Sequence, residues 1–295
     1  MIRVMPSKVA PTLMPATGAS PRDRARIINE AYADYYVPTH ISESQMRRMD
    51  QIYDVDLAHS VAVRAGGEWV GMAMLAQRGN RGWVSSVGVI PAWRRRGLAR
   101  AMMERLLSSA RELGLEEVTL EVIDGNEPAR NLYEALGFRA TRELLSWRRD
   151  ANADSLPAPD ERLRRADPAE MLALHLGWRS EPPSWQRDAP TLRRLTEGAD
   201  AYRVASTFDA WQTVGYVIYS DLGERIAVLD VGADPDRGGV RSVRVVLQAL
   251  AVLNAGKAIS ISNVPVDDPL NRALAALGFL VGVRQYEMRL EVNGA

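Results

Sequence analysis

Three consecutive arginines, Arg94 to Arg96, stand immediately before Gly97 and a segment whose apolar residues recur at helical spacing. A helix begins at the positive end of its dipole, so acidic residues or a Ser, Thr, Asp or Asn cap are expected there rather than cations. The first N–H groups of a helix lack partners within it, and Gly97 and Ala99 let a ligand approach them closely. Guanidinium groups suit phosphate oxygens. This stretch therefore indicates a phosphate or pyrophosphate site.

The arginine cluster also has a simpler interpretation as a solvated surface. It is not a Walker loop, because no Gly-Lys-Ser/Thr ending is present, and a dinucleotide fingerprint is missing as well. A protein that binds nucleotide phosphates in general is an alternative function, and the arginines are the only evidence for it.

The elements around the arginines predict an α/β domain with a mixed sheet. Residues 67–77 and 82–90 alternate or run apolar and are typical of strands. Helical spacing runs from Leu98 to a terminal glycine at position 114. A strand over 118–123 and a helix over 128–137 follow. Strands and helices in this order are typical of α/β architecture.

The two halves of the chain resemble each other. Residues 124–138 read DGNEPARNLYEALGF and residues 265–279 read PVDDPLNRALAALGF, each after an apolar strand and a long aliphatic helix. Residues 149–161 contain two prolines and no periodicity, as expected of a linker. We therefore expect domains over 1–150 and 161–295, joined by a linker over 151–160.

Composition excludes several classes of function. The chain has 37 basic and 37 acidic residues, so its formal charge of zero argues against nucleic-acid or membrane-surface binding. It has no cysteine and three histidines, so no metal site and no thiol nucleophile are expected. No segment has the roughly 20 apolar residues of a membrane helix. The expected location is the cytoplasm.

Two motifs resemble the GNAT acetyltransferase superfamily. Residues 94–99, after the strand end at 87–91, look like its acyl-CoA-binding pattern Gln/Arg-x-x-Gly-x-Gly/Ala. Residues 120–138, LEVIDGNEPARNLYEALGF, follow at a distance similar to that in the family, especially in its ribosomal-protein alanine N-acetyltransferase branch. The resemblance covers about residues 60–148, with a weaker version over about 226–290. It implies two tandem GNAT-like domains, each with a mixed β-sheet flanked by helices.

The resemblance implies acetyl-CoA as the acyl donor and assigns residues to it. In the family, two parallel strands part and the pantetheine arm of the donor lies between them, which assigns that arm to the backbone of Val87 and Val89, with a bulge at Gly88. The same residues also suit a plain sheet core. The resemblance assigns the pyrophosphate to the loop and first helical turn, which comprise Arg94, Arg95, Arg96, Gly97, Leu98, Ala99 and Arg100.

Two asparagines are assigned to the donor by the same resemblance. Asn126 matches a residue that contacts the cofactor arm, and its alternative role is a helix cap ahead of Pro128. Asn131 is a further candidate, and an exposed helix face explains it equally well.

Tyr133 and Glu121 are the catalytic candidates. Tyr133 matches the family's tyrosine near the thioester sulfur, and its reference pKa of about 10 against about 8.5 for a thiol suits proton donation to a leaving thiolate. Its alternative role is in the core. Glu121 would act as a base, directly or through water, because an alkyl amine of pKa about 10.4 is protonated at neutral pH. An exposed or ion-paired glutamate is the alternative.

The acceptor pocket should involve the early helices. Residues 29–48 offer Tyr32, Tyr35, Tyr36 and His40, although an aromatic cluster of this kind is more often core. The acceptor is expected to be a primary amine on a small molecule or a protein.

The second copy is expected not to catalyse transfer. Pro235 aligns with Pro91, but Asp234 and Asp236 would repel a pyrophosphate, and Leu274 stands where Tyr133 stands in the first copy. The chain as a whole is expected to be an acetyl-CoA-dependent N-acetyltransferase that works by direct attack. The alternative is a non-catalytic acyl-CoA-binding sensor or scaffold module.

Overall fold

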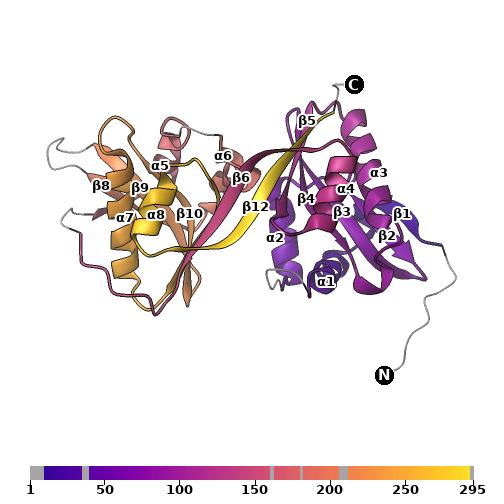
Figure 1. Cartoon of the computed structure of the whole chain (residues 1–295), viewed down its shortest axis with the longest axis horizontal. Coiled ribbons are helices and arrows are strands. Elements are labelled where there is room, and N and C mark those ends of the chain that lie inside the picture. The colour runs from indigo at the N-terminus through magenta and orange to yellow at the C-terminus, as the bar shows by residue number, and fades with distance from the viewer. Residues whose placement is uncertain (1–9, 35–39, 160–162, 180–181, 206–211, 293–295) are drawn as a thin grey trace. The chain divides into compact units, whose positions relative to one another are not determined.

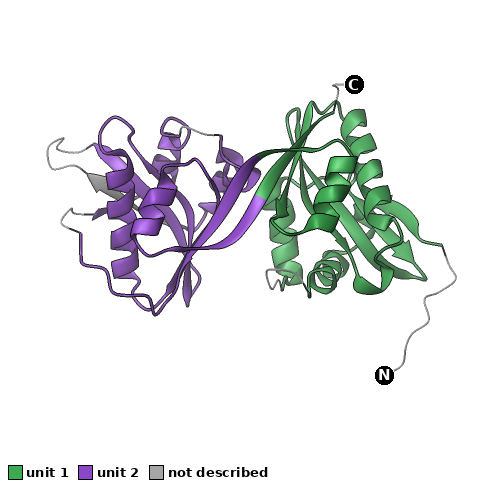
Figure 2. Cartoon of the chain, in the orientation of Figure 1, with its two compact units in different colours: residues 1–141, 286–295 green, residues 142–285 purple. Residues whose placement is uncertain are grey.

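The computed structural model describes residues 10–34, 40–159, 163–179, 182–205 and 212–292. These residues form two compact units, one of residues 1–141 with 286–295 and one of residues 142–285 (Figure 2). Each unit is a mixed sheet with helices packed on it (Figure 1), so the predicted α/β class is confirmed. None of the helices in the described ranges is long and apolar enough to span a membrane.

The sheet of unit 1 carries the predicted strands in the order β1-β2-β3-β4-β5-β12. Neighbouring strands from β1 to β4 are antiparallel, and β4 with β5 is parallel. The last strand enters from the far end of the chain. The bounds are β1 Thr12–Pro15, β2 Val61–Ala65, β3 Glu68–Arg78, β4 Arg81–Val89, β5 Glu117–Ile123 and β12 Leu280–Glu291.

In the described part of unit 1 there are four α-helices, and their local sequences explain their ends. They are α1 Pro21–Ala31, α2 Glu43–Tyr53, α3 Leu98–Glu112 and α4 Glu127–Ala135. Capping boxes start the first two, because the Ser20 and Ser42 hydroxyls each accept a hydrogen bond from the N–H of the third helical residue. In return, the backbone N–H of each serine donates a hydrogen bond to the side chain of that residue. The long helix α3 begins without a side-chain cap, and its apolar face is fully buried in the core of the unit.

Unit 2 repeats this plan with its strands in the order β6-β11-β10-β9-β8-β7. Among the paired strands of the sheet, β10 and β11 are parallel and the others antiparallel. The strands are β6 Arg139–Arg149, β7 Leu163–Ala166, β8 Asp200–Ala205, β9 Thr213–Asp221, β10 Arg225–Ala233 and β11 Ala258–Pro265. The helices are α5 Pro168–Leu174, α6 Ala189–Leu195, α7 Gly239–Leu253 and α8 Leu270–Ala276.

The boundary between the units lies elsewhere than the sequence suggests. The expected first domain ends at residue 150, whereas the compact units divide between Thr141 and Arg142, inside β6. The strand β12 likewise starts in unit 2 and ends in unit 1, where Arg289 pairs with Glu117 at 2.5 Å. No Gly or Pro interrupts β6, so no sequence signal marks the division within it. Residues 151–159, at the expected linker, contain no helix or strand.

Helices α1 and α2 are joined by a buried ion pair. Arg24 is 1% exposed and donates two parallel hydrogen bonds to the Asp50 carboxylate, at 2.7 and 2.8 Å. A planar guanidinium held in this way fixes the relative position of the two helices. Their C-terminal ends carry Tyr32 and Tyr53, two aromatic residues that border the candidate site.

Removing Arg24 should therefore destabilise unit 1. We expect Arg24→Met to lower the free energy of unfolding by about 3 kcal/mol, because Asp50 would keep a partly buried charge without its cation. The exposed pair of Arg47 and Glu43, at 2.6 Å, supplies the control, and Arg47→Met should cost under about 0.5 kcal/mol. Equal losses for the two variants in denaturant titrations would contradict this role.

Candidate active site

The sheet of unit 1 opens between β4 and β5. These parallel strands are paired from Arg81 with Glu117 to Val84 with Leu120, and no further. Ser85 is an extra residue on β4, because Met74 of β3 pairs with Ser86 while Leu75 pairs with Val84. A bulge of this kind bends the strand that carries it. The remainder of β4 stays paired with β3 on one side and presents its other edge to the opening.

Val87 and Val89 lie on this open part of β4. Both are half-buried and pack against the core of the unit. The carbonyl of Val87 accepts a hydrogen bond from the Tyr32 hydroxyl at 2.9 Å, and that of Val89 accepts one from Arg94 Nε at 3.2 Å. Helix α1 and the arginine loop are thereby attached to the strand at the opening.

Gly88 serves a purpose other than the expected bulge, which lies at Ser85. A Cβ atom at position 88 would stand 3.0 Å from the Cβ of Ala31, tighter than ordinary contacts. The glycine therefore lets the C-terminal end of α1 pack closely against β4.

The loop before α3 has the backbone geometry of an anion site. Arg95 has φ of 61° and Gly97 φ of 76°, so two residues in left-handed conformation flank Arg96. Successive N–H groups in such an arrangement form a concave nest that binds anions. The first turn of α3 follows at once, from Leu98 to Arg100, and adds outward N–H groups and the positive dipole end. The space where a Cβ of Gly97 would lie is open.

The arginine side chains account for the unusual charge at this helix start. Arg94 donates to the carbonyl of Ala31 at 2.7 Å, so its cation stabilises the C-terminal end of α1, where positive charge is favourable. This contact gives Arg94 a partner within the chain, and the expectation that it faces an anion stays a prediction. Arg96 stacks over the ring of Trp93 at 4.6 Å, and Arg100 pairs with Glu104 at 3.5 Å. All three are exposed.

Helix α4 holds Asn126, Asn131 and Tyr133. Asn126 caps the helix, since its side chain accepts from the N–H of Ala129 at 3.4 Å, which is the alternative role foreseen for it. Asn131 is exposed. Tyr133 is 8% exposed and packs edge-on against Phe138 with ring centroids 6.1 Å apart.

Glu121 stands on β5 just beyond the last paired residue. The carboxylate accepts a hydrogen bond from the indole N–H of Trp83 on β4, at 2.7 Å. Tyr53 packs edge-on against Trp83 at 5.4 Å, and its pKa is raised by burial and by the charge of Glu121, and lowered to a smaller extent by Arg78. Sequence reasoning missed Trp83 and Tyr53, because an aromatic residue in a strand or at a helix end is ordinarily read as core.

The comparisons with known proteins agree on the family. Residues 25–138 match the model of the acetyltransferase (GNAT) family. N-alpha-acetyltransferases from Sulfurisphaera tokodaii and Saccharolobus solfataricus are each 28% identical over 122 residues, which cover 41% of this chain and 73% of theirs. The match to the GNAT acetyltransferase family thus lies within unit 1.

Solved structures extend the likeness of fold over the whole chain. A GCN5-related N-acetyltransferase from Sphaerobacter thermophilus has a TM-score of 0.73 at 20% identity, covering 96% of each chain. A tandem GNAT protein from the clavulanic acid biosynthesis pathway has a TM-score of 0.71 at 19% identity, covering 97% of this chain and 100% of that one. The expected tandem GNAT architecture is therefore confirmed.

Of the other acceptor candidates, the structure describes only His40. His40 is exposed, and Tyr35 and Tyr36 lie outside the described residues.

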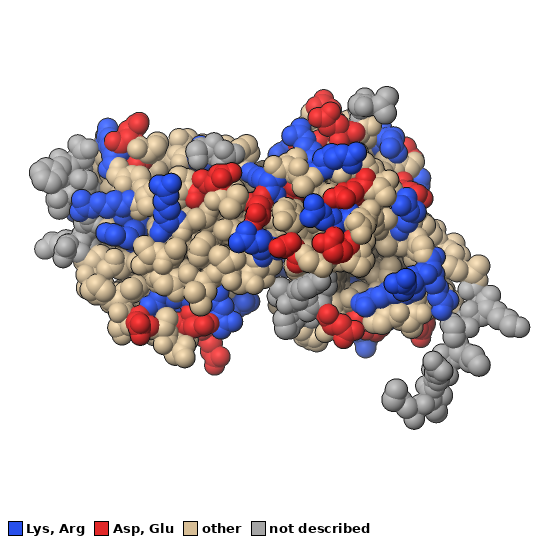
Figure 3. Space-filling view, viewed as in Figure 1, with Lys and Arg blue, Asp and Glu red and all other residues tan. Residues whose placement is uncertain are grey.

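Within the described ranges, no group of three or more metal-ligating side chains could hold a metal ion. On the visible face of each unit, basic and acidic side chains are mixed (Figure 3).

The GNAT-like sheet of unit 2 opens at the corresponding place. Pairing of β10 with β11 ends at Val228 with Ile261, and Leu229 is the extra residue that corresponds to Ser85. Arg187 crosses this opening, because its guanidinium donates to the carbonyl of Ser262 on β11 and to the carboxylate of Asp230 on β10, both at 3.3 Å.

Asp230 is the centre of a buried polar cluster in unit 2. Its carboxylate is fully buried and bonds the Tyr216 hydroxyl at 2.6 Å, His175 Nδ1 at 2.8 Å and the guanidinium of Arg179. Burial, together with Arg179 and Arg187, lowers the pKa of His175 to about 3, so this histidine is neutral at physiological pH. Leu274, which replaces Tyr133, is buried in the apolar core of the unit.

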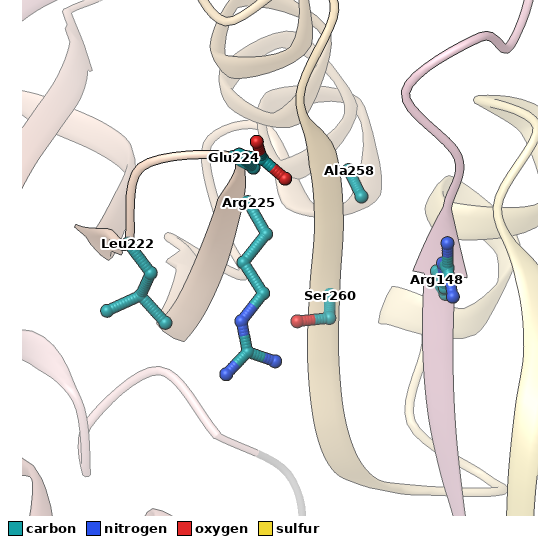
Figure 4. Close-up of a pocket in the computed structure, with 6 residues that line it drawn as sticks. All are labelled: Arg148, Leu222, Glu224, Arg225, Ala258 and Ser260. Carbon is teal, nitrogen blue, oxygen red and sulfur yellow. The ribbon is translucent and has the colours of Figure 1, made fainter. Parts of the chain in front are cut away.

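A separate pocket of unit 2 lies away from this opening. Its volume is about 490 Å³, and it is lined by Arg148, Leu222, Glu224, Arg225, Ala258 and Ser260 (Figure 4). Arg225 and Ala258 are the first paired residues of β10 and β11, so the pocket lies at the closed end of the strand pair.

Proposed function

We propose that this protein is an N-acetyltransferase that transfers an acetyl group from acetyl-CoA to a primary amine, and that unit 1 carries the reaction. The observation that supports this most is the opening between β4 and β5, which lies directly beside the anion-binding loop. The match of residues 25–138 to the GNAT acetyltransferase family agrees with it.

The residues of unit 1 suit an acyl-CoA donor. An extended arm with amide groups can bind along the open edge of β4 as an added strand would, at Val87 and Val89. A pyrophosphate suits the nest at Arg95 to Gly97 and the first turn of α3, with Leu98 buried beneath it. We also assign Asn126, at the start of α4, and Asn131, within α4, to contacts with this ligand.

Acetyl-CoA, when bound, supplies a thioester whose carbonyl carbon an amine can attack directly, with release of the CoA thiolate. Tyr133, whose side chain is buried, donates a proton to that leaving sulfur. Glu121 removes a proton from the amine, directly or through a water molecule. Since the chain has no cysteine, no acyl-enzyme forms on sulfur. Holding the two substrates together contributes much of the rate.

Unit 2 takes no donor in this proposal. The guanidinium of Arg187 joins the parted strands at the place where an arm would lie, and Leu274 offers no proton. Asp234 and Asp236 would repel a pyrophosphate before α7. The unit instead supports the fold of the chain.

The acceptor is proposed to be an amine on a small molecule or a protein. Because the matched relatives are N-alpha-acetyltransferases, peptides with free N-terminal amines belong in the first panel of acceptors, beside amino sugars and alkyl amines.

Donor binding is tested most sharply at Gly97. Aspartate and asparagine both tolerate the left-handed conformation and cap helices, and a Cβ at this position meets open space. We expect Gly97→Asp to weaken acetyl-CoA binding at least tenfold by calorimetry, because its carboxylate repels the pyrophosphate. Gly97→Asn should stay within a few-fold of the parent. Equal affinities for the two variants would refute a pyrophosphate site at this loop.

Catalysis is tested by CoA release with a thiol-reactive dye, which reports no background from a chain without cysteine. With an accepted amine, Tyr133→Phe should lower kcat by a factor of roughly 10² while acetyl-CoA binding is retained. Unchanged turnover would remove Tyr133 as the acid. Tight acetyl-CoA binding without release for any amine would favour the sensor or scaffold module instead.

A further inference from the structure

A tryptophan on the neighbouring strand holds the carboxylate of Glu121. Trp83 is 2% exposed and pairs with Thr119 across the parallel strands. Side chains two residues apart on a strand share a face, so Glu121 lies on the same side of the sheet as Thr119 and Trp83. The indole N–H reaches Oε2 of the carboxylate at 2.7 Å, a short distance typical of a hydrogen bond to a charged acceptor.

The indole ring is itself fixed from the side of α2. Tyr53, the last residue of α2, meets the ring of Trp83 edge-on, with centroids 5.4 Å apart and planes at 66°. This end of the helix is anchored by Arg78 at the end of β3, which donates to the Asp54 carboxylate at 2.6 Å and to the carbonyl of Ile52 at 3.1 Å. A continuous set of contacts therefore runs from Arg78 through the end of α2 to Trp83 and the carboxylate.

We propose that Trp83 is a positioning residue, which holds the carboxylate of Glu121 in one orientation and in its ionised form for removal of the acceptor's proton. This inference rests on the proposed function, since it assigns Trp83 a role only if Glu121 is the base. An indole is a donor only, so it cannot take a proton from the carboxylic acid or stabilise the neutral form by accepting one.

The Tyr53 hydroxyl interacts electrostatically with the Glu121 carboxylate and with Arg78 of β3. Burial and the charge of Glu121 raise the pKa of Tyr53, so its hydroxyl stays neutral at physiological pH.

The hydrogen bond can be tested without any acceptor, by following the indole N–H signals of the intact protein in an NMR pH titration. The chain has seven tryptophans, and the signal that is missing in Trp83→Phe identifies the one concerned. We expect this signal to lie downfield and to follow one acidic titration that disappears in Glu121→Gln, whose amide oxygen still accepts the bond. A signal that does not titrate, or that titrates unchanged in Glu121→Gln, would overturn the proposal.

Kinetics with an accepted amine then test the role. Trp83→Phe keeps an aromatic ring but lacks the donor, and we expect kcat to fall about tenfold with little change in the KM for acetyl-CoA. The acid limb of kcat/KM should move to higher pH by roughly one unit, because a hydrogen bond to the ionised form favours that form. Trp69→Phe, at a tryptophan that is likewise buried in unit 1 but packs against Arg64, should leave the pH profile in place.

The two proposals fail in different ways. If Glu121→Gln keeps full activity, Glu121 is not the base and the proposed mechanism fails with the inference. If Glu121→Gln is impaired while Trp83→Phe keeps its rate and its acid limb, the base stands and the positioning role is refuted. If Trp83→Phe loses activity only in proportion to its loss of folded protein, with the acid limb unmoved, Trp83 is a packing residue and the role is likewise refuted.

Discussion

The parting of β4 from β5 is the constraint on which the candidate site of unit 1 depends. One extra residue on β4, Ser85, bends the strand away from its parallel neighbour after four paired positions. A backbone edge inside the sheet then lacks a neighbouring strand, and its carbonyls at Val87 and Val89 accept hydrogen bonds from the Tyr32 and Arg94 side chains instead. The arginine loop, the start of α3 and the Glu121 carboxylate all border this opening, so the same distortion arranges the groups of the proposed donor site.

The two halves of the chain deal with this same distortion in different ways. Unit 2 keeps the bulge and the parting, but Arg187 and Asp230 join the strands with the chain's own side chains. Burying such charges is expensive, and it is tolerated because each is paired and hydrogen-bonded within the cluster. The low pKa of His175, about 3, reflects the same burial and the two nearby cations. In unit 2, side chains of the chain itself thus occupy the opening between the parallel strands. In unit 1, the nest and the edge of β4 suit a ligand.

Local patterns made much of unit 1 predictable. The helix starting at Leu98, the strands on either side of the opening and the duplication all follow from periodicity and short motifs, and residues 94–100 point to an anion through backbone geometry that glycine and helix starts dictate. The partner of Arg94 was not predictable, because the Ala31 carbonyl is 63 residues away and becomes its neighbour only once α1 packs on β4. The same holds for Trp83 and Glu121, which are 38 residues apart.

The sequence also did not predict that β6 and β12 each run from one unit into the other. The sequence pattern of a strand such as β6 is the same whether the strand ends in one compact unit or continues into the next. This is because alternation and strand propensity are local properties. The bulge was expected at Gly88, where glycine would permit it, but the register places it at Ser85 and uses Gly88 for contact with α1. Both cases depend on long-range packing that no short segment records.

A crystal structure of the protein with acetyl-CoA would show where the donor binds. We expect one donor molecule per chain, with its arm along Val87 and Val89 in the opening of unit 1 and its pyrophosphate on the N–H groups from Arg95 to Arg100. A donor bound in unit 2, or an opening between β4 and β5 that stays filled by side chains while the donor binds elsewhere, would contradict this expectation.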